Sequence, residues 1–198
     1  QALLSGAHGD LGDAYIEIED VSSALLERRA ALAIDQRLSN KEPANAFRLR
    51  DLALDHRQIG EALQLQREVQ SALTEFRVSV AISASLHAKD PTNQYFLTDL
   101  VFGHQHIGEL LLADGDPTGA LAAFRASLEF AERVPATSPD APRPRVFDAH
   151  RLIGRALAAQ GSFADALDET ERMRAGYALL ASSAPDVVGY QIELSRSH

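Results

Sequence analysis

The 198-residue chain contains no cysteine, and this absence removes several kinds of chemistry at once. Disulfide bonds, thiolate zinc sites and cysteine nucleophiles all need a thiol, so these residues form none of them. The absence is compatible with a reducing compartment, and we expect a cytoplasmic protein. No apolar run approaches the roughly 20 residues that a membrane-spanning helix needs. No signal peptide is visible either.

Positive charge is also in short supply. The chain has 19 Lys and Arg residues against 28 Asp and Glu residues, which gives a net charge of −9 and a pI near 5.2. Phosphate backbones and anionic membrane surfaces attract basic stripes, so this balance argues against nucleic-acid and membrane partners. The chain is nevertheless 45% hydrophobic, which is ordinary for a folded protein and too apolar for disorder.

Signals for β-strands are lacking as well. No segment combines sustained alternation of apolar and polar residues with β-branched and aromatic enrichment. Apolar residues recur instead at helical spacing, and the breaks between them contain Asn, Asp, Gly and Pro. The sequence therefore predicts an all-α protein, with helices at about 2–18, 21–38, 44–66, 68–86, 94–113, 117–134, 145–160 and 163–180.

One short motif returns four times along the chain. It consists of a histidine, two variable residues, Ile or Leu, and a glycine; the glycines are Gly12, Gly60, Gly108 and Gly154, at spacings of 48, 48 and 46 residues. Twelve residues after each glycine stands an alanine, and nineteen after each alanine stands a proline. A fixed period of 20 to 50 residues is the signature of a solenoid. Three markers in step over four copies predict a repeat protein in which each unit packs on its neighbours.

These markers also set the expected repeat boundaries. The copies span about 1–42, 43–90, 91–138 and 139–184, and a partial fifth copy follows at 185–198. Few residues precede the first motif histidine, and the last residue corresponds to the motif histidine of the fifth copy. We therefore expect a single repeat array that is a piece of a longer polypeptide. Four of the eight prolines fall within 135–144, which predicts an extended connector there.

This set of positions resembles the tetratricopeptide repeat (TPR). The matching features are the apolar–glycine pair, an apolar residue three positions later, the alanine at twelve, and an aromatic four after that alanine, present as Phe76 and Phe124. The resemblance implies a right-handed α-α superhelix of antiparallel helix pairs, with about four repeats and a truncated fifth. The 48-residue period exceeds the family's usual 34 and is similar to arrays in large bacterial proteins, which often accompany a protein kinase or a caspase-like protease.

The sequence departs from the family pattern at three positions. Histidine replaces the usual aromatic four residues before the motif glycine. The turn glycine within each pair survives in the third and fourth copies but is Glu19 and Arg67 in the first two. Arg28 and Thr170 stand where the second and third copies have their aromatic residue.

The resemblance also implies a binding surface. The family's first helices line a concave groove that takes an extended peptide or a partner's helix, and the positions facing it lie two before each histidine, one after it, and one after the glycine. Copy by copy, these positions are Gly6, Gly9 and Asp13; Leu54, Arg57 and Glu61; Phe102, Gln105 and Glu109; and Asp148, Arg151 and Arg155. The last two arginines are four apart on one helical face, where they could hold an acidic peptide group. A solvated face without a ligand is the alternative interpretation.

Seven histidines invite a metal site, but their spacing argues against one. Zinc needs three or four ligands within about 2 Å of the ion, whereas stacked repeats lie roughly 10 Å apart. His104 and His106 are two apart and do not share a helix face. We therefore expect the motif histidines to be packing residues whose ring nitrogens make local hydrogen bonds. We also predict that folding keeps these rings neutral, with a pKa below the unfolded value of about 6.5.

Intrinsic catalysis is not expected. Carboxylates such as Glu17 fit a solvent-facing helix, and Ser83 or Ser85 near His87 has no third partner to orient the pair. No glycine-rich phosphate loop follows a strand, because no strand is predicted. The sequence predicts a scaffold that binds a protein or peptide within a larger protein and needs no cofactor. The alternative is a structural spacer or self-association module attached to a catalytic domain.

Overall fold

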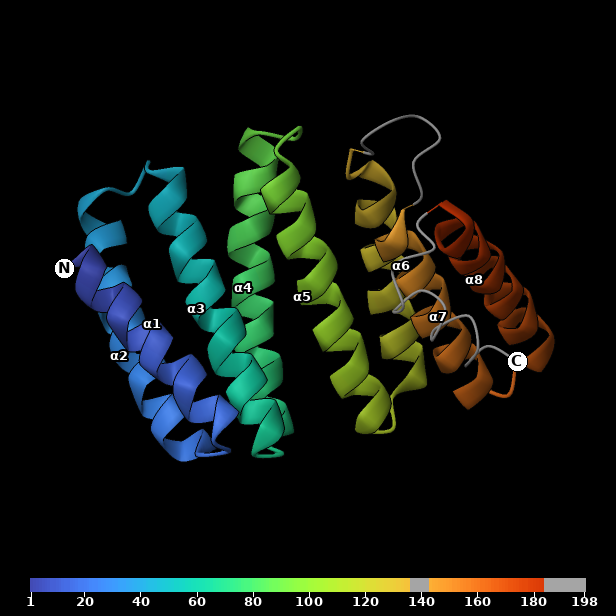
Figure 1. Cartoon of the computed structure of the whole chain (residues 1–198), viewed down its shortest axis with the longest axis horizontal. Helices are drawn as coiled ribbons and strands as arrows, with labels where there is room; N and C mark the ends of the chain where they lie inside the picture. The colour runs from blue at the N-terminus through green and yellow to red at the C-terminus, as the bar shows by residue number, and fades with distance from the viewer. Residues whose placement is uncertain (136–142, 184–198) are drawn as a thin grey trace. The chain divides into compact units, whose positions relative to one another are not determined.

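The computed structural model describes residues 1–135 and 143–183. These residues form eight α-helices, and no strand occurs among them (Figure 1). The helices are α1 (Ala2–Glu17), α2 (Val21–Lys41), α3 (Ala46–Leu65), α4 (Val69–Lys89), α5 (Gln94–Ala113), α6 (Pro117–Arg133), α7 (Pro144–Ala159) and α8 (Phe163–Ser183). Most of the predicted connector and the whole partial fifth copy lie outside the described residues.

All eight predicted helices are present, and three of them run further than expected. The ends of α2, α4 and α8 lie three residues beyond the predicted ends. The first two continue up to the residue that precedes a proline, which leaves the helical region: Glu42 has φ −128° and ψ 61°, and Asp90 has φ −138° and ψ 84°. Proline crowds the backbone of the residue before it, and this clash fixes where both helices end.

Side-chain caps fix several of the helix starts. The carboxylate of Asp20 accepts a hydrogen bond from the Ser23 amide at 3.1 Å. Hydrogen bonding by the Ser23 side chain, and to a smaller extent by this amide, lowers the pKa of Asp20. Asn45 and Asn93 cap α3 and α5 through their side-chain oxygens. Pro117 occupies the first turn of α6, where its missing N–H would have no partner within the helix.

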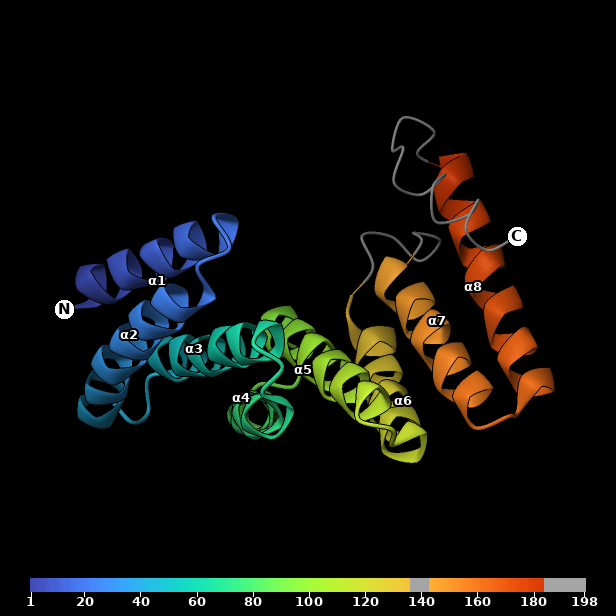
Figure 2. The same cartoon turned by 90° about the horizontal axis from the view of Figure 1, so that it is seen from below.

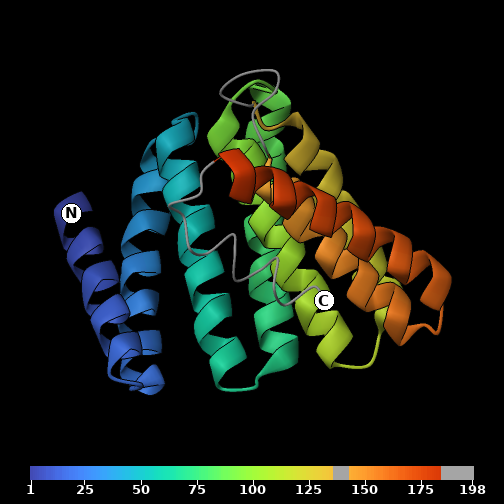
Figure 3. The same cartoon turned by 45° about the vertical axis from the view of Figure 1, so that its right-hand side comes forward.

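The chain divides into two compact units, residues 1–99 and 100–198, and the boundary falls inside α5. In the first unit α1 packs on α2, α2 on α3, and α3 on α4; in the second, α6 packs on α7 and α7 on α8. Figures 2 and 3 show the partners of the pairs α1–α2, α3–α4 and α7–α8 lying side by side. Each of these pairs runs antiparallel because only three residues join its helices.

In every helix pair, one residue of the turn between the two helices has a positive φ in the left-handed region. It is Glu19 at φ 61°, Arg67 at φ 62°, Gly115 at φ 84° and Gly161 at φ 81°. In the first pair the Asp20 amide donates to the Tyr15 carbonyl at 2.9 Å, which is the 6→1 bond of a Schellman turn. The two copies without the family glycine therefore make the same turn, but from residues for which this backbone region is unfavourable.

The motif glycine makes room for the residue sixteen positions later in the chain. A Cβ on Gly60 would lie 2.9 Å from a ring carbon of Phe76, and a Cβ on Gly108 would overlap the ring of Phe124. Both phenylalanines are fully buried. In the first pair the same space holds the side chain of Arg28, whose Cγ would lie 2.9 Å from a Cβ on Gly12. The glycine thus accommodates whatever side chain the second helix presents.

The marker alanines lie in the same contact between the two helices of a pair, which is called the seam below. Ala24, Ala72 and Ala120 have no exposed surface, and Ala166 is also buried. Serine hydroxyls bridge the helices of a pair nearby: Ser79 donates to the Ala53 carbonyl at 2.7 Å, and Ser127 donates to the Val101 carbonyl at 3.1 Å. Small residues at these positions bring two backbones close enough for a single hydroxyl to span them. The glycine and alanine markers are therefore the positions at which the two helices of a pair pack most closely.

Candidate binding surface

Three of the four motif histidines within the described residues pair with a glutamate on the second helix of their pair. The Nδ1 atoms of His8, His56 and His150 lie 2.5, 2.6 and 2.5 Å from an Oε2 atom of Glu27, Glu75 and Glu169, respectively. The predicted local hydrogen bonds of the ring nitrogens are confirmed in these three copies. The glutamates themselves were missed, although each stands three residues after a marker alanine and could have been found by aligning the copies.

In the third copy the motif histidine has a different partner. Ala123 stands where the other copies have glutamate, and the ring of His104 stacks on Phe130 with 5.7 Å between ring centroids and 14° between planes. Burial lowers the pKa of His104, and the charge of Glu129 opposes this shift only in part. The predicted downward shift of the pKa is confirmed at His104. Within residues 1–135 and 143–183, no three side chains of metal-ligating type converge on one point.

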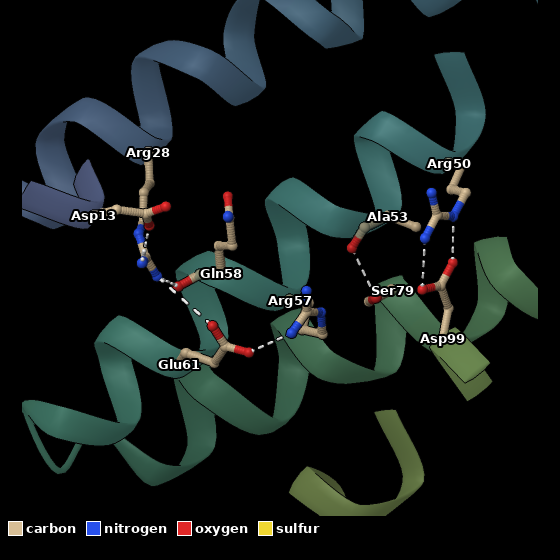
Figure 4. A network of polar contacts seen from close by, with 9 residues as sticks. All are labelled: Asp13, Arg28, Arg50, Ala53, Arg57, Gln58, Glu61, Ser79 and Asp99. Atoms are coloured by element: carbon tan, nitrogen blue, oxygen red, sulfur yellow. Dashed lines mark hydrogen bonds and ion pairs between the residues drawn. The ribbon is translucent and has the colours of Figure 1, made fainter. Parts of the chain in front are cut away.

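Arg28 connects three helices from the seam of the first pair. Its guanidinium is only 5% exposed; Nη2 donates to Asp13 Oδ1 at 2.9 Å and Nη1 donates to the Gln58 carbonyl (Figure 4). Glu61 Oε2 lies 3.9 Å from Nη1. A buried cation needs such partners to offset its lost hydration. The substitution of arginine for the family aromatic therefore exchanges a packed ring for a polar link between α1, α2 and α3.

The predicted groove residues of the second copy take part in this network. Arg57 Nη1 lies 2.8 Å from Glu61 Oε1, one helical turn further along α3 (Figure 4). Because Glu61 also faces Arg28, the two groove positions are held by intramolecular ion pairs. Leu54, the third predicted position, is half-buried and lines a cavity in the same unit.

Arg50 and Asp99 form a second polar link within the first unit. Arg50 donates from Nε to Asp99 Oδ2 at 2.7 Å and from Nη2 to Asp99 Oδ1 at 3.2 Å (Figure 4). Its guanidinium carbon also lies 5.0 Å from the centre of the Tyr95 ring. The hydrogen bonds with Asp99 raise the pKa of Arg50. This bidentate geometry is the strongest arrangement available to an Arg–carboxylate pair.

An acidic cavity of about 330 Å³ opens between α1, α2 and α3. Four predicted groove positions line it, and five aspartates surround it: Gly6, Gly9, Asp13 and Leu54 are the groove positions, and the aspartates are Asp10, Asp13, Asp35, Asp51 and Asp55. Arg48 is the single cationic residue of the lining. Four of the six predicted positions of the first two copies thus lie around one cavity, and Arg57 and Glu61 are not part of its lining.

Two of these carboxyl groups are buried next to each other. Asp35 accepts a hydrogen bond from the Ser5 hydroxyl at 2.5 Å, and both residues are buried. Burial, the charge and hydrogen bond of Asp35, and the charge of Asp51 together raise the pKa of Asp55 to about 8. Asp55 therefore carries a proton at neutral pH. Nothing in the sequence signals this, because it depends on how closely Asp35 of α2 approaches Asp51 and Asp55 of α3.

The predicted positions of the second unit have different surroundings. Asp148 accepts a hydrogen bond from the Tyr177 hydroxyl at 2.5 Å, and Arg151 Nε lies 3.9 Å from Asp148 Oδ1. Arg155 is exposed. The remaining positions belong to α5: Phe102 lies 5.8 Å below the guanidinium of Arg145, and Gln105 and Glu109 are half-buried.

Of the two serines considered as nucleophiles, Ser85 is exposed and Ser83 is buried. Ser83 is 1% exposed and its Oγ has no hydrogen-bond partner among the described residues. A substrate could not reach this buried hydroxyl from solvent. The geometry of the first unit therefore draws attention to the acidic cavity and not to the serine of α4.

Antiparallel helix pairs, closed by a left-handed turn and packed through a glycine that admits the second helix, define a TPR-like helical-hairpin protein. BtubC (BKLC) from P. vanneervenii has a similar structure, with a TM-score of 0.73 at 15% identity over 90% of this chain. A candidate kinesin light chain from Podosopora anserina with nearly identical TPR-like repeats aligns over 100% of this chain and 86% of its own, with a TM-score of 0.67 at 17% identity.

These similarities concern the fold, and they confirm the predicted all-α, TPR-like fold class. The chain spans 65% of the length of BtubC. The sequence matches no model of a protein family and no curated protein. Among the described helices, none combines the length and the apolar character that crossing a membrane requires.

Proposed function

We propose that this chain is a protein- or peptide-binding module. The observation that carries the proposal is the cavity of the first unit, because the positions that line it are those at which TPR-like first helices face a ligand. Its volume of about 330 Å³ lies within the range of binding pockets, about 300–1,000 Å³. Carboxylates that are already aimed into such a cavity need little reorganisation when a ligand binds.

The second unit offers a surface of opposite charge. Arg151 and Arg155 lie one helical turn apart on α7, and Arg155 is exposed to solvent. Two guanidinium groups at this spacing suit an acidic side chain or a terminal carboxylate of a bound peptide. The 3.9 Å contact between Arg151 and Asp148 is long for an ion pair and leaves the arginine able to turn towards a ligand.

Selection of peptides from a random library on the purified chain tests this function. We expect a set of enriched peptides whose affinity falls at least tenfold in the double variant Arg151→Glu, Arg155→Glu. The control variant, Arg77→Glu with Arg125→Glu, makes the same change of net charge at two exposed positions outside the predicted groove. No enrichment of any peptide would instead favour the structural spacer, and equal affinity for both double variants would place the bound peptides away from the arginines of α7.

Self-association is a second candidate function, and one surface favours it. Leu4, Leu11 and Ile18 are exposed and follow one another at seven-residue intervals along one side of α1 and its C-cap. A stripe of this kind suits a second helix. Sedimentation of the parent and of Leu11→Glu checks this: self-association through the stripe requires a dimer in the parent that the variant loses.

The proposal extends to the protein that carries this module. A bacterial, cytoplasmic parent with a protein kinase or caspase-like domain is the context in which long repeats of this type are expected. The amino-acid sequence on either side of these residues tests that part of the proposal directly.

A further inference from the structure

The Arg50–Asp99 link has a counterpart one 48-residue period earlier in the chain, and there the arginine is missing. The equivalent positions are Ala2 and Asp51. In the later pair of positions the guanidinium binds the carboxylate through two hydrogen bonds. In the earlier pair Ala2 has no polar side chain, and both Ala2 and Asp51 line the acidic cavity. Asp51, the counterpart of the carboxylate that binds Arg50, therefore borders the acidic cavity, where no arginine of the equivalent position is present.

The carboxylates around this space differ in how well they are paired. Asp13 accepts a hydrogen bond from Arg28, Asp51 Oδ2 lies 3.5 Å from Arg48 Nη1, and Asp35 accepts a hydrogen bond from Ser5. Asp55 is different. It is 8% exposed, it lines the cavity, and its buried Oδ2 has no hydrogen-bond partner among the described residues. A buried oxygen without a partner is costly, so a donor that enters the cavity gains from pairing with it.

The arrangement of these groups selects the class of donor. No three metal-ligating side chains converge within the described residues, so the carboxylates are too dispersed to surround a bare metal ion. A guanidinium group offers five N–H donors in a flat fork and is more weakly hydrated than an ammonium group. Its donors can reach several separated carboxylate oxygens at once. The cavity is also large enough for the arginine side chain that carries such a group.

We propose that the cavity between α1, α2 and α3 binds a guanidinium group, supplied by an arginine side chain of a protein partner, and that Asp51 and Asp55 are its principal acceptors. This inference rests on the proposed peptide-binding function. It adds the chemistry that the first unit recognises: a basic residue of the partner occupies the position that Arg50 occupies one repeat later.

Binding is coupled to the release of a proton. A guanidinium favours the ionised form of Asp55, whose pKa stands at about 8 in the free protein. The other charged groups facing Asp55 are Asp10 and Asp13 from α1, Asp35 from α2, and Arg48 and Asp51 from α3. Affinity should therefore rise with pH up to about 8, by at most about tenfold per pH unit. The guanidinium stays charged throughout this range.

A titration followed by amide NMR shifts tests the inference on the whole chain. The probe is acetyl-Gly-Arg-Gly-amide, and the control peptide replaces arginine by citrulline, a neutral group of nearly the same shape. We expect a saturable shift of amides around Leu54 and Asp55 with the arginine peptide, and affinity at least tenfold weaker with the citrulline peptide. Equal binding of the two peptides, or no saturable shift with either, overturns the proposal.

Two variants locate the site. Ala2→Arg supplies the side chain of the equivalent position from within the chain and should abolish binding of the arginine peptide. Asp55→Asn should weaken binding at least tenfold and remove its pH dependence. The matched control Asp165→Asn makes the same charge change on exposed surface of α8 and should leave the affinity unchanged. Full binding by Ala2→Arg contradicts the proposal, and the spectrum of each variant reports whether it is folded.

Ethylguanidinium distinguishes a free small cation from an arginine within a peptide. Weaker binding of this cation, competed by the arginine peptide, supports recognition of a protein partner. Tighter binding of ethylguanidinium than of the arginine peptide would contradict the proposal that a protein partner supplies the guanidinium group. The two proposals fail separately. Enriched peptides without an arginine preference at this cavity refute the present inference alone, whereas the absence of both enriched peptides and arginine-peptide binding refutes the proposed function as well.

Discussion

Among the described residues, the first unit buries eight polar or ionisable side chains, and four of these are ionisable: Arg28, Asp35, Asp55 and Asp99. The described part of the second unit buries only Ser127. Both units use the same repeat frame, with glycine, alanine and a left-handed turn at corresponding positions. The frame therefore sets how the helices of a pair approach, and the residues added to it decide whether the interior is polar or apolar.

The seam positions show this difference most directly. Gly12 accommodates Arg28 in the first unit, whereas Gly108 accommodates Phe124 in the second. The ring contributes buried hydrocarbon. The guanidinium contributes directed bonds to Asp13 and Gln58, and a buried ion pair is weak evidence for stability in itself. We infer that the polar seam specifies which helices meet, while the aromatic seam supplies more of the stability.

The largest effect is expected at the aromatic seam. Phe124→Ala removes a fully buried ring and should lower the free energy of unfolding by about 3–5 kcal/mol. Chemical denaturation of the variant measures this loss. The matched change Phe163→Ala removes an exposed ring and should cost less than about 0.5 kcal/mol. Similar losses in the two variants would contradict the assignment of stability to the aromatic seam.

The acidic cavity should make the first unit sensitive to alkali. The pKa of Asp55 is about 8 in the folded chain and about 3.9 when unfolded, so the folded state binds more protons between these values. Stability from this group is complete below about pH 4 and is lost as the pH rises to 8, by at most about 1.4 kcal/mol per pH unit. Denaturant midpoints at pH 5, 6, 7 and 8 measure the slope.

The variant Asp55→Asn separates this effect from other titrations. It keeps the shape of the side chain without its ionisation, so the stability of the first unit should fall less steeply with pH than in the parent. Asp165→Asn, on exposed surface, should keep the slope of the parent. An identical slope in Asp55→Asn would show that the carboxyl group does not control the pH response.

Overpacking the seam should have an intermediate effect. Ala120 is fully buried between α5 and α6, so Ala120→Leu should destabilise the chain by about 1–3 kcal/mol. Ala122 lies on the exposed side of the same helix, and Ala122→Leu should leave the denaturant midpoint almost unchanged. Equal midpoints for the two leucine variants would argue against the close approach of the helices.

The second unit should respond to acid where the first responds to alkali. The pKa of His104 is lowered by burial, so the folded state binds fewer protons than the unfolded chain around pH 6.5. Stability from this ring is complete above about 6.5 and is lost as the pH falls through the folded pKa, by less than about 1.4 kcal/mol per unit. His104→Phe should reduce this loss, and thermal midpoints at pH 7.5 and 5.5 compare the two chains.

The smallest effect is expected at the turns. Glu19→Gly and Arg67→Gly relieve an unfavourable left-handed backbone and should each stabilise the first unit by about 1 kcal/mol. Gln66→Gly is the matched control, because Gln66 has φ −78° and gains nothing from glycine. A gain in Gln66→Gly equal to that in Arg67→Gly would refute the strain at the left-handed position.

The helices were predictable because their signals are local and repeated. Periodicity, proline breaks and the three markers recur in step, and each copy supports the assignment of the next. The polar links depend instead on where side chains from different helices meet. Arg50 and Asp99 are 49 residues apart, and neither the charge nor the spacing distinguishes this pair from others along the chain. The surroundings of the Asp55 carboxyl group, whose Oδ2 has no hydrogen-bond partner among the described residues, exist only when α1, α2 and α3 are all in place.

The strength of the link made by Arg28 depends on ionic strength, whereas the packing of the aromatic pairs does not. Its partner Asp13 is 59% exposed, so dissolved ions reach this side of the bond. At about 1 M salt the screening length falls to about 3 Å, close to the length of the bond itself. Concentrated salt should loosen the attachment of α1 while the phenylalanine seams keep their packing. A change of buffer could therefore free one helix of the first unit and leave the other pairs closed.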